Sequence, residues 1–404
     1  MALPPSMPYS AVRSARDFVT RTSATSPQPP VPLTYQPALD GLRAIAVLAV
    51  MLFHAGVPLL PGGFLGVDIF FVLSGYLITT LLAADFASGD AAVTNGAPGQ
   101  RDTSGTRAAN NRIHLGRFYM RRALRLFPAL LLLVAFLQFW TMRNVFPLPG
   151  QVAEIRREIV TTLLYVANWA QVARIVEPLG FLSHTWSLAI EEQFYIVWPL
   201  VLGWLLRSVS RGAACWIVAA GALVSALARA MLWSGPESFA RVFHGSDTRA
   251  EALLAGCLLA LLLGQRPVAE MAASRRTAVG FAAAASALVL AWLFSHATTE
   301  SGWMYRGGFS LAAAAAMLVI LELRVAPGGA FARILSMAPA VAIGRISYGL
   351  YLWHWPLFLI LSPWMTGLAP GATLAVRFAA TFAVAALSWF VLERPVLSWK
   401  RRWS

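Results

Sequence analysis

The sequence predicts an all-α protein, a polytopic membrane helix bundle of about ten transmembrane helices. Hydrophobic residues make up 58% of the 404 residues, and charged residues only 12%. The mean hydropathy is +0.63, which leaves no room for a separate soluble domain. Apolar runs that approach the roughly 20 residues needed to cross a bilayer core recur along the chain. They lie near 41–57, 64–84, 126–142, 186–206, 213–233, 250–264, 278–295, 306–323, 342–361 and 372–392.

Charge and composition divide the chain into three parts. We expect a disordered cytoplasmic tail over residues 1–37, a transmembrane domain over residues 38–396 and a basic cytoplasmic tail over residues 397–404. With the N-terminus inside, 23 of the 32 Arg and Lys residues lie on the cytoplasmic side, so both termini are predicted to be cytoplasmic. The net charge of +14 then reflects loops that face anionic lipid, not nucleic-acid binding. Segment 158–169 is interpreted as an external or re-entrant helix, because a further span there would invert this asymmetry.

The first two apolar runs form a tight hairpin, and the first run carries Arg43 and His54. Eleven residues are close to three helical turns, so both side chains share one face and lie about 16 Å apart along it. Ionisable groups inside a membrane are costly and usually face a protein interior or a wet cavity. A functional pair is therefore one interpretation. The other is an Arg that reaches the lipid headgroups and a His that bonds a backbone carbonyl.

Asp68 lies near the start of the second span. It could pair with His54 or Arg43 and so belong to the same site, or it could simply cap its helix.

The stretch IHLGRFYMRRALRLF, residues 113–127, is predicted to be a basic helix at the membrane surface that leads into the third span. Its arginines, Arg121 among them, fit a positive-inside anchor. Arg122 and Arg125, one turn apart, together with the adjacent Arg121, also fit a phosphate clamp that would bind a cofactor, because guanidinium forks bind phosphate oxygens bidentately.

Adjacent carboxylates, Glu191 and Glu192, lie in the apolar stretch HTWSLAIEEQFYIVWP, residues 184–199, with Ser187 one turn before. Both cannot face lipid, so at least one should point into a cavity or pair with an arginine. The alternative is a structural ion pair between helices, with Arg249 or Arg377 as candidate partners.

The stretch GRISYGLYLWHWP, residues 344–356, places Ser347, Tyr351 and His354 on one helical face. His354 lies about as deep from the cytoplasmic side as His54. It could act in catalysis, but orienting or packing His54 is the expected role. The two cysteines, Cys215 and Cys257, show no metal-ligand spacing, and we expect no metal.

These stretches resemble the acyltransferase-3 family of bacterial integral-membrane O-acyltransferases. The resemblance rests on six motifs that follow the family's order and cover about residues 35–396. They are LDGLRAIAVLAVMLFH, GGFLGVDIFFVLSGYLIT, FYMRRALRLFPA, HTWSLAIEEQFYIVWP, ISYGLYLWHWPL and the terminal ERP.

The resemblance implies a multi-pass protein of the bacterial cytoplasmic membrane. It implies transfer of an acyl group, most often acetyl, from cytoplasmic acyl-CoA to a hydroxyl of a carbohydrate acceptor. The family's Arg and His pattern falls on Arg43 and His54, its Arg-x-x-Arg pattern on Arg122 and Arg125, and its acidic motif on Glu191 and Glu192. Many members carry an added hydrolase-like domain, which is not expected in this sequence.

Acyl transfer to an alcohol needs a base, donors for the tetrahedral oxyanion and a site for the phosphates of the donor. His54 is the expected base or a transient acyl carrier, and Arg122 and Arg125 are the expected phosphate ligands. A proton-coupled transporter uses similar intramembrane groups and is the alternative function, although no internal repeat is visible. A structural membrane protein without chemistry is a third possibility. The sequence alone leaves the acceptor, the acyl length and the oligomeric state open.

Overall fold

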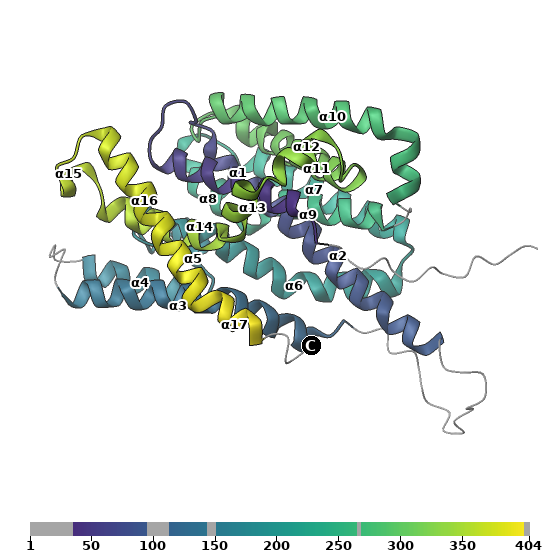
Figure 1. Ribbon diagram of the computed structural model, residues 1–404, viewed down its shortest axis with the longest axis horizontal. Coiled ribbons are helices and arrows are strands. Elements are labelled where there is room, and N and C mark those ends of the chain that lie inside the picture. Colours follow the sequence, from purple (N-terminus) through teal and green to yellow (C-terminus); the bar gives the residue numbers. More distant parts are fainter. Residues whose placement is uncertain (1–34, 95–112, 144–150, 265–267, 400–404) are drawn as a thin grey trace, which may run out of the picture.

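The computed structural model describes residues 35–94, 113–143, 151–264 and 268–399 (Figure 1). Within these ranges the chain forms helices joined by short turns, and it contains no strand. The predicted all-α bundle is therefore confirmed. The predicted tails, residues 1–37 and 397–404, lie largely outside the described residues.

The long helices carry most of the chain. They are α1 (Pro37–His54), α2 (Gly66–Thr94), α3 (Leu115–Met142), α6 (Trp186–Ser208), α7 (Arg211–Leu232), α9 (Ser246–Leu263), α10 (Val268–His296), α11 (Phe309–Val325), α14 (Ser347–Ile360) and α16 (Pro370–Ser388). The shorter elements are η1 (Gly63–Leu65), α4 (Gln151–Leu163), α5 (Ala167–Val172), η2 (Ser183–Thr185), η3 (Pro236–Ser238), α8 (Phe239–His244), η4 (Met304–Gly308), α12 (Ala330–Leu335), α13 (Ala338–Arg345), α15 (Pro363–Thr366), η5 (Trp389–Glu393) and α17 (Arg394–Trp399).

Among the described residues, eight helical segments have the length and composition of a membrane span. They are formed by α1, α2, α3, α6, α7, α10, α11 and the continuous run from α16 to α17. The other two predicted spans, 250–264 and 342–361, are helical but are not among these eight segments. α9 carries three charged residues in its first two turns, and 342–361 divides at Ile346 into α13 and α14. Segment 158–169 falls on α4 and α5, which are both too short to span.

The composition of residues 85–111 predicts a linker with little fixed structure. α2 instead continues to Thr94. Alanines in this stretch favour the helix. The Asp85 carboxylate also accepts the backbone N–H of His114 at 2.9 Å, which ties this part of α2 to the start of α3. The prediction for the first ten residues of the linker was therefore wrong, and 95–111 lie outside the described residues.

α1 occupies the centre of the bundle and packs against α2, α13 and α14. A Cβ atom at Gly63 would lie 2.2 Å from the Ala49 carbonyl oxygen, and one at Gly66 would lie 2.3 Å from that of Ala46. These close approaches fix the antiparallel register of α1 and α2. In Figure 1, α10 runs along one edge of the bundle, while α3, α4 and α17 lie at the opposite edge.

Candidate functional site

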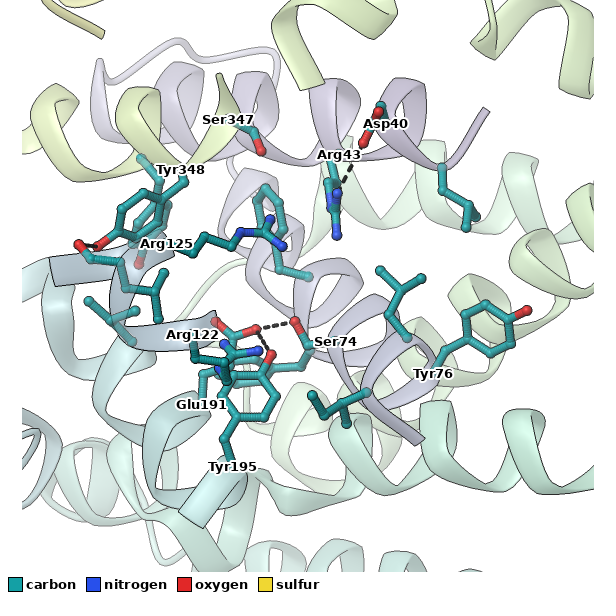
Figure 2. A pocket seen from close by; sticks show the side chains of 18 of the residues that line it. Asp40, Arg43, Ser74, Tyr76, Arg122, Arg125, Glu191, Tyr195, Ser347 and Tyr348 are labelled. Carbon is teal, nitrogen blue, oxygen red and sulfur yellow. Dashed lines mark hydrogen bonds and ion pairs between the residues drawn. The ribbon is translucent and has the colours of Figure 1, made fainter. Parts of the chain in front are cut away.

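A cavity of about 370 Å³ opens between α1, α2, α3, α6 and α14 (Figure 2). Its wall combines charged groups with apolar side chains. Of the residues predicted for the site, it brings together Arg43, Arg122, Arg125, Ser187, Glu191 and Tyr351.

Arg43 lies in the cavity wall as predicted. Its Nη1 donates to Asp40 Oδ1 at 3.0 Å, one turn earlier on α1. The other Asp40 oxygen accepts the Tyr35 hydroxyl at 2.7 Å. Asp40 therefore orients the guanidinium of Arg43 and offsets part of its charge.

Arg122 and Arg125 both line the cavity from α3, but their surroundings differ. Arg122 donates to Glu192 Oε1 at 2.9 Å and stacks on the Tyr195 ring, 3.2 Å from its centroid. Within the described chain, no carboxylate lies within ion-pair distance of Arg125. Figure 2 shows the Arg125 side chain extending toward Arg43 across the cavity. Arg125 is therefore more available to a ligand than Arg122.

Arg324, from the end of α11, also lines the cavity and was not predicted to do so. The lining thus holds four arginines against two carboxylates, those of Asp40 and Glu191. This excess of positive charge in a half-enclosed space favours an anionic ligand. Arg121 is absent from the lining, so the structure places it outside the predicted clamp.

Glu191 projects into the cavity from α6 and accepts two hydroxyl hydrogen bonds. The donors are Ser74 of α2 and Tyr195, whose hydroxyl lies 2.7 Å from Glu191 Oε1 (Figure 2). The adjacent Glu192 instead pairs with Arg122. The expectation that at least one of the two points into a cavity or pairs with an arginine agrees with the structure, which gives one role to each residue. The partner is Arg122 and neither Arg249 nor Arg377.

Ser187 is the second residue of α6 and Tyr351 lies in the second turn of α14, and both line the cavity. Their hydroxyl oxygens lie 2.5 Å apart, and the Tyr351 hydroxyl also lies 2.8 Å from the His184 carbonyl oxygen. These contacts fix the Tyr351 ring at the inner end of the cavity.

His54 does not line the cavity. Its Nδ1 lies 3.0 Å from Nε2 of His354, and its ring packs beside Trp355 with centroids 4.9 Å apart. His354 is fully buried, and its Nδ1 lies 2.6 Å from the Tyr351 carbonyl oxygen. The predicted pairing of the two histidines is thus present. One helical turn, about 4.5 Å of rise, separates His354 from Tyr351 at the end of the cavity.

Asp68 does not belong to this site. Both of its carboxylate oxygens accept from Arg249 Nη2 at 3.0 Å, and the pair is fully buried between α2 and α9. Arg249 also packs over the ring of Phe309, 4.1 Å from the centroid. The predicted contact of Asp68 with His54 or Arg43 was wrong, because Val67 and Phe71 face the cavity while Asp68 is turned about 100° away toward α9.

Sequence reasoning missed several polar residues of the site, among them Ser74, Arg324, Tyr348 and His184. Ser74 and Tyr348 are ordinary polar residues of a span, and only the packing of α2 and α14 brings them to the cavity. Arg324 has the pattern of a positive-inside anchor. His184 carried a usable signal, since it begins the acidic motif, and its ring packs 5.4 Å from that of His354.

A carboxylate outside the candidate spans supports this histidine cluster near His184. Glu158 of α4 is buried and accepts the backbone N–H of Leu182 at 3.3 Å, two residues before His184. The neighbouring Gly180 carbonyl accepts the indole N–H of Trp355 at 2.7 Å. Burial raises the pKa of Glu158 to about 8.

This pKa shift predicts a pH-dependent stability. Because the folded-state pKa exceeds the ordinary Glu value, the folded protein binds the proton more tightly than the unfolded chain. The contribution of Glu158 is therefore present below about pH 4.5 and is lost as pH rises toward 8. We expect the Tm of the purified protein to fall over this window, and the Tm of Glu158→Gln to fall less. Parallel curves for the two proteins would contradict the assignment.

In the part of the chain that the structure describes, no group of three or more His, Cys, Asp or Glu side chains is arranged to hold a metal ion. The candidate site therefore consists of arginines, hydroxyls, carboxylates and a histidine pair.

Comparison with known proteins identifies relatives that are named as O-acetyltransferases. O-acetyltransferase OatA of Staphylococcus aureus strain NCTC 8325 is 32% identical over 372 residues, which is 90% of this chain and 57% of the relative. Peptidoglycan O-acetyltransferase OatA of Listeria monocytogenes EGD-e is 33% identical over 371 residues, 90% of this chain and 56% of the relative. Putative O-acetyltransferase SAS0844 of S. aureus MSSA476 is 34% identical, with 90% and 57% covered.

The chain therefore spans a little more than half the length of these relatives. No solved structure matches it significantly. The acyltransferase domain that defines the acyltransferase-3 family matches residues 36–393, nearly all of the transmembrane domain. The chain thus belongs to the acyltransferase-3 family of membrane proteins.

Proposed function

We propose that the protein transfers an acetyl group from cytoplasmic acetyl-CoA to a sugar hydroxyl on the opposite side of the membrane. The observation that carries this proposal is the cavity, which begins among arginines and ends one helical turn from the His54 and His354 pair. Phosphates of the donor bind at the arginines, and the thioester arm extends inward. The relatives named as O-acetyltransferases support the reaction class.

The arginines at one end of the cavity would hold the donor. Arg125 offers an unpaired guanidinium fork, which suits the phosphates of CoA. Arg43 lies on α1, across the cavity from Arg125, and about 16 Å from His54 along the helix axis. A donor held by these two side chains would extend along the axis of the bundle toward Tyr351. The volume of about 370 Å³ is near the lower end of the roughly 300–1,000 Å³ usual for ligand pockets, which suits the arm of the donor with its nucleotide at the mouth.

The hydrogen bonds of the histidine pair favour His54 as the general base. The Tyr351 carbonyl can only accept, so His354 Nδ1 carries the proton in their 2.6 Å contact. In neutral His354, Nε2 is then the acceptor, and His54 Nδ1 donates to it. This tautomer leaves His54 Nε2 with a lone pair that can take the proton of the acceptor hydroxyl.

In the proposed reaction the acceptor oxygen attacks the thioester carbonyl while its proton moves to His54 Nε2. The tetrahedral oxyanion collapses, the C–S bond breaks, and the thiolate of CoA takes up the proton. His354 holds His54 in the required orientation through both states. Because the Tyr351 ring lies between the cavity and the histidines, the thioester must pass this ring to react.

Peptidoglycan carbohydrate is the first acceptor to test, because one relative is named for it. We expect mass spectrometry of muropeptides, surface glycans and secreted glycosides to show a gain of one acetyl group in cells with the gene and none in cells without it. Purified protein should release free thiol from acetyl-CoA when the acceptor is present. Proton movement in liposomes without any thiol release would instead indicate a transporter.

The orientation follows from the charge asymmetry and can be tested by reporter fusion. A reporter placed after Arg107 should behave as cytoplasmic, and one placed in the loop around α15 should behave as external. This topology places the arginine end of the cavity on the side of cytoplasmic acetyl-CoA. The reverse pattern at both sites would contradict the proposed direction of transfer.

A further inference from the structure

A crevice of about 170 Å³ lies between α3 and α6, beside the cavity described above. Arg122, Leu126 and Tyr195 line both spaces and so form the wall between them. Five further residues line the crevice and are absent from the cavity lining: Tyr119, Ala123, Phe127, Glu192 and Ile196.

The crevice lies on a lipid-facing part of the bundle. Phe127 is 36% exposed and Ile196 is 56% exposed, and both belong to helices with the length and composition of a membrane span. Leu131 on α3 and Leu200 on α6, one turn farther along each helix, are also exposed. Because exposed apolar side chains on membrane spans contact lipid chains, a ligand can reach the crevice from the bilayer.

The depth of the crevice matches that of a phospholipid headgroup. α3 begins at Leu115, so Tyr119 and Arg122 lie about 6 Å and 10 Å along it from its start. Arg117, two residues before Tyr119, is exposed. The polar end of the crevice is therefore near the membrane surface, and its apolar end lies deeper.

Arg122 and Glu192 give this polar end one charge of each sign. Arg122 Nη2 donates to Glu192 Oε1 at 2.9 Å, and the two side chains remain 19% and 12% exposed. Among the described residues, Arg122 Nη1 and Glu192 Oε2 make no hydrogen bond. An ion pair inside a membrane protein is costly unless its remaining donors and acceptors are satisfied. The crevice therefore suits a ligand that carries both an anion and a cation.

The walls of the crevice are held in place by contacts between the two helices. The Tyr119 hydroxyl of α3 donates to the Ile196 carbonyl of α6 at 2.9 Å. The Arg122 guanidinium lies 3.2 Å from the centroid of the Tyr195 ring, and the Tyr195 hydroxyl donates to Glu191 (Figure 2). The ion pair is thus oriented before any ligand binds.

We propose that this crevice binds the zwitterionic headgroup of a phospholipid, with phosphatidylethanolamine as the probe. The phosphate accepts from Arg122, and the ammonium donates to Glu192, so the four charges alternate in sign. The small side chain of Ala123 leaves room for the headgroup, and the lipid chains follow the exposed faces of Phe127 and Ile196. Phosphatidylglycerol has the same phosphate without an ammonium, so its negative charge meets the Glu192 carboxylate uncompensated.

The test is native mass spectrometry of the full-length protein in detergent, titrated with phosphatidylethanolamine and phosphatidylglycerol. We expect one phosphatidylethanolamine to bind with a Kd about tenfold lower than that of phosphatidylglycerol, the size of one hydrogen bond between charged groups. Glu192→Gln removes the partner of the ammonium and the repulsion of the anion. Its Kd for phosphatidylglycerol should therefore become equal to that for phosphatidylethanolamine or lower.

A steric variant and its matched control locate the site. Ala123→Phe fills the crevice and should raise the Kd for phosphatidylethanolamine about tenfold. Met120→Phe adds a ring on the same helix at a position that is 57% exposed and absent from the crevice lining. It should leave this Kd unchanged.

Equal binding of the two lipids by the wild type would indicate an adventitious boundary lipid only and would overturn the proposal. So would an unchanged preference in Glu192→Gln or unchanged binding in Ala123→Phe, and either folded variant is sufficient to decide. The inference does not depend on the acyl donor. Absence of thiol release from acetyl-CoA would overturn the proposed function and leave the lipid site intact.

Discussion

His54→Ala should abolish acetyl transfer while the protein remains folded and inserted. Removal of a positioned general base costs about 10² to 10⁴ in rate, and loss of a covalent carrier would cost more. His54→Gln should fail equally, because its amide keeps a hydrogen bond to His354 but cannot accept a proton. The measurement is acetylated product per amount of membrane-inserted protein, with Tm as the check on folding.

His354 provides the comparison, because it contacts His54 but is not the proposed base. His354→Gln retains an oxygen that can accept from His54 Nδ1, so it should lose less activity than either His54 variant. Near-normal turnover in His54→Gln would make His54 a structural residue. The proton would then have to go to Glu191, Glu192 or His354, and the proposed mechanism would be wrong.

Arg125→Lys should weaken binding of acetyl-CoA more than Arg122→Lys does. Lys keeps the positive charge but loses the bidentate fork, and Arg122 already uses one guanidinium nitrogen on Glu192. Arg125→Ala should raise Kd by roughly 10- to 100-fold, the equivalent of about 1.5–3 kcal/mol for a charged hydrogen bond. Isothermal titration of the detergent-purified variants measures the change.

Acetyl-pantetheine, which lacks the nucleotide phosphates, is the ligand control for this prediction, and Arg121→Lys is the variant control. Arg121 lies on the same helix but outside the cavity lining, so its replacement should leave the Kd for acetyl-CoA unchanged. Equal losses for acetyl-CoA and acetyl-pantetheine in Arg125→Ala would show that Arg125 supports the fold of the cavity and does not bind phosphate.

The sequence predicted those parts of the site that depend on single helices. Arg43 stands out because an arginine inside an apolar run needs a partner or a cavity, and the structure gives it both. By the same reasoning, at least one of the adjacent carboxylates Glu191 and Glu192 needs a cavity or an arginine partner. Ser187 and Tyr351 were recognised through their spacing from other polar residues on their own helices.

What the sequence did not predict depends on how helices pack. Asp68 and Arg249 are 181 residues apart, and only the contact of α2 with α9 makes them partners. Arg122 and Arg125 form an equivalent pair in sequence, but one meets Glu192 and the other faces open space. The division of 342–361 into α13 and α14 likewise reflects tertiary contacts, because Gly344 packs directly on the Asp40 backbone.

The buried pair of Asp68 and Arg249 has a consequence for how the protein is made. α9 carries Asp247, Arg249 and Glu251 in its first turns. An Asp or Arg costs about 2.5 to 3.5 kcal/mol at the centre of an inserting helix and less toward its end. Such a segment is poorly retained in the bilayer as an independent unit. Its counter-charge on α2 is synthesised first and is already in the membrane when α9 leaves the ribosome. The pair therefore couples α9 to the amino-terminal hairpin, and a chain that lacks the hairpin should retain α9 in the membrane less well.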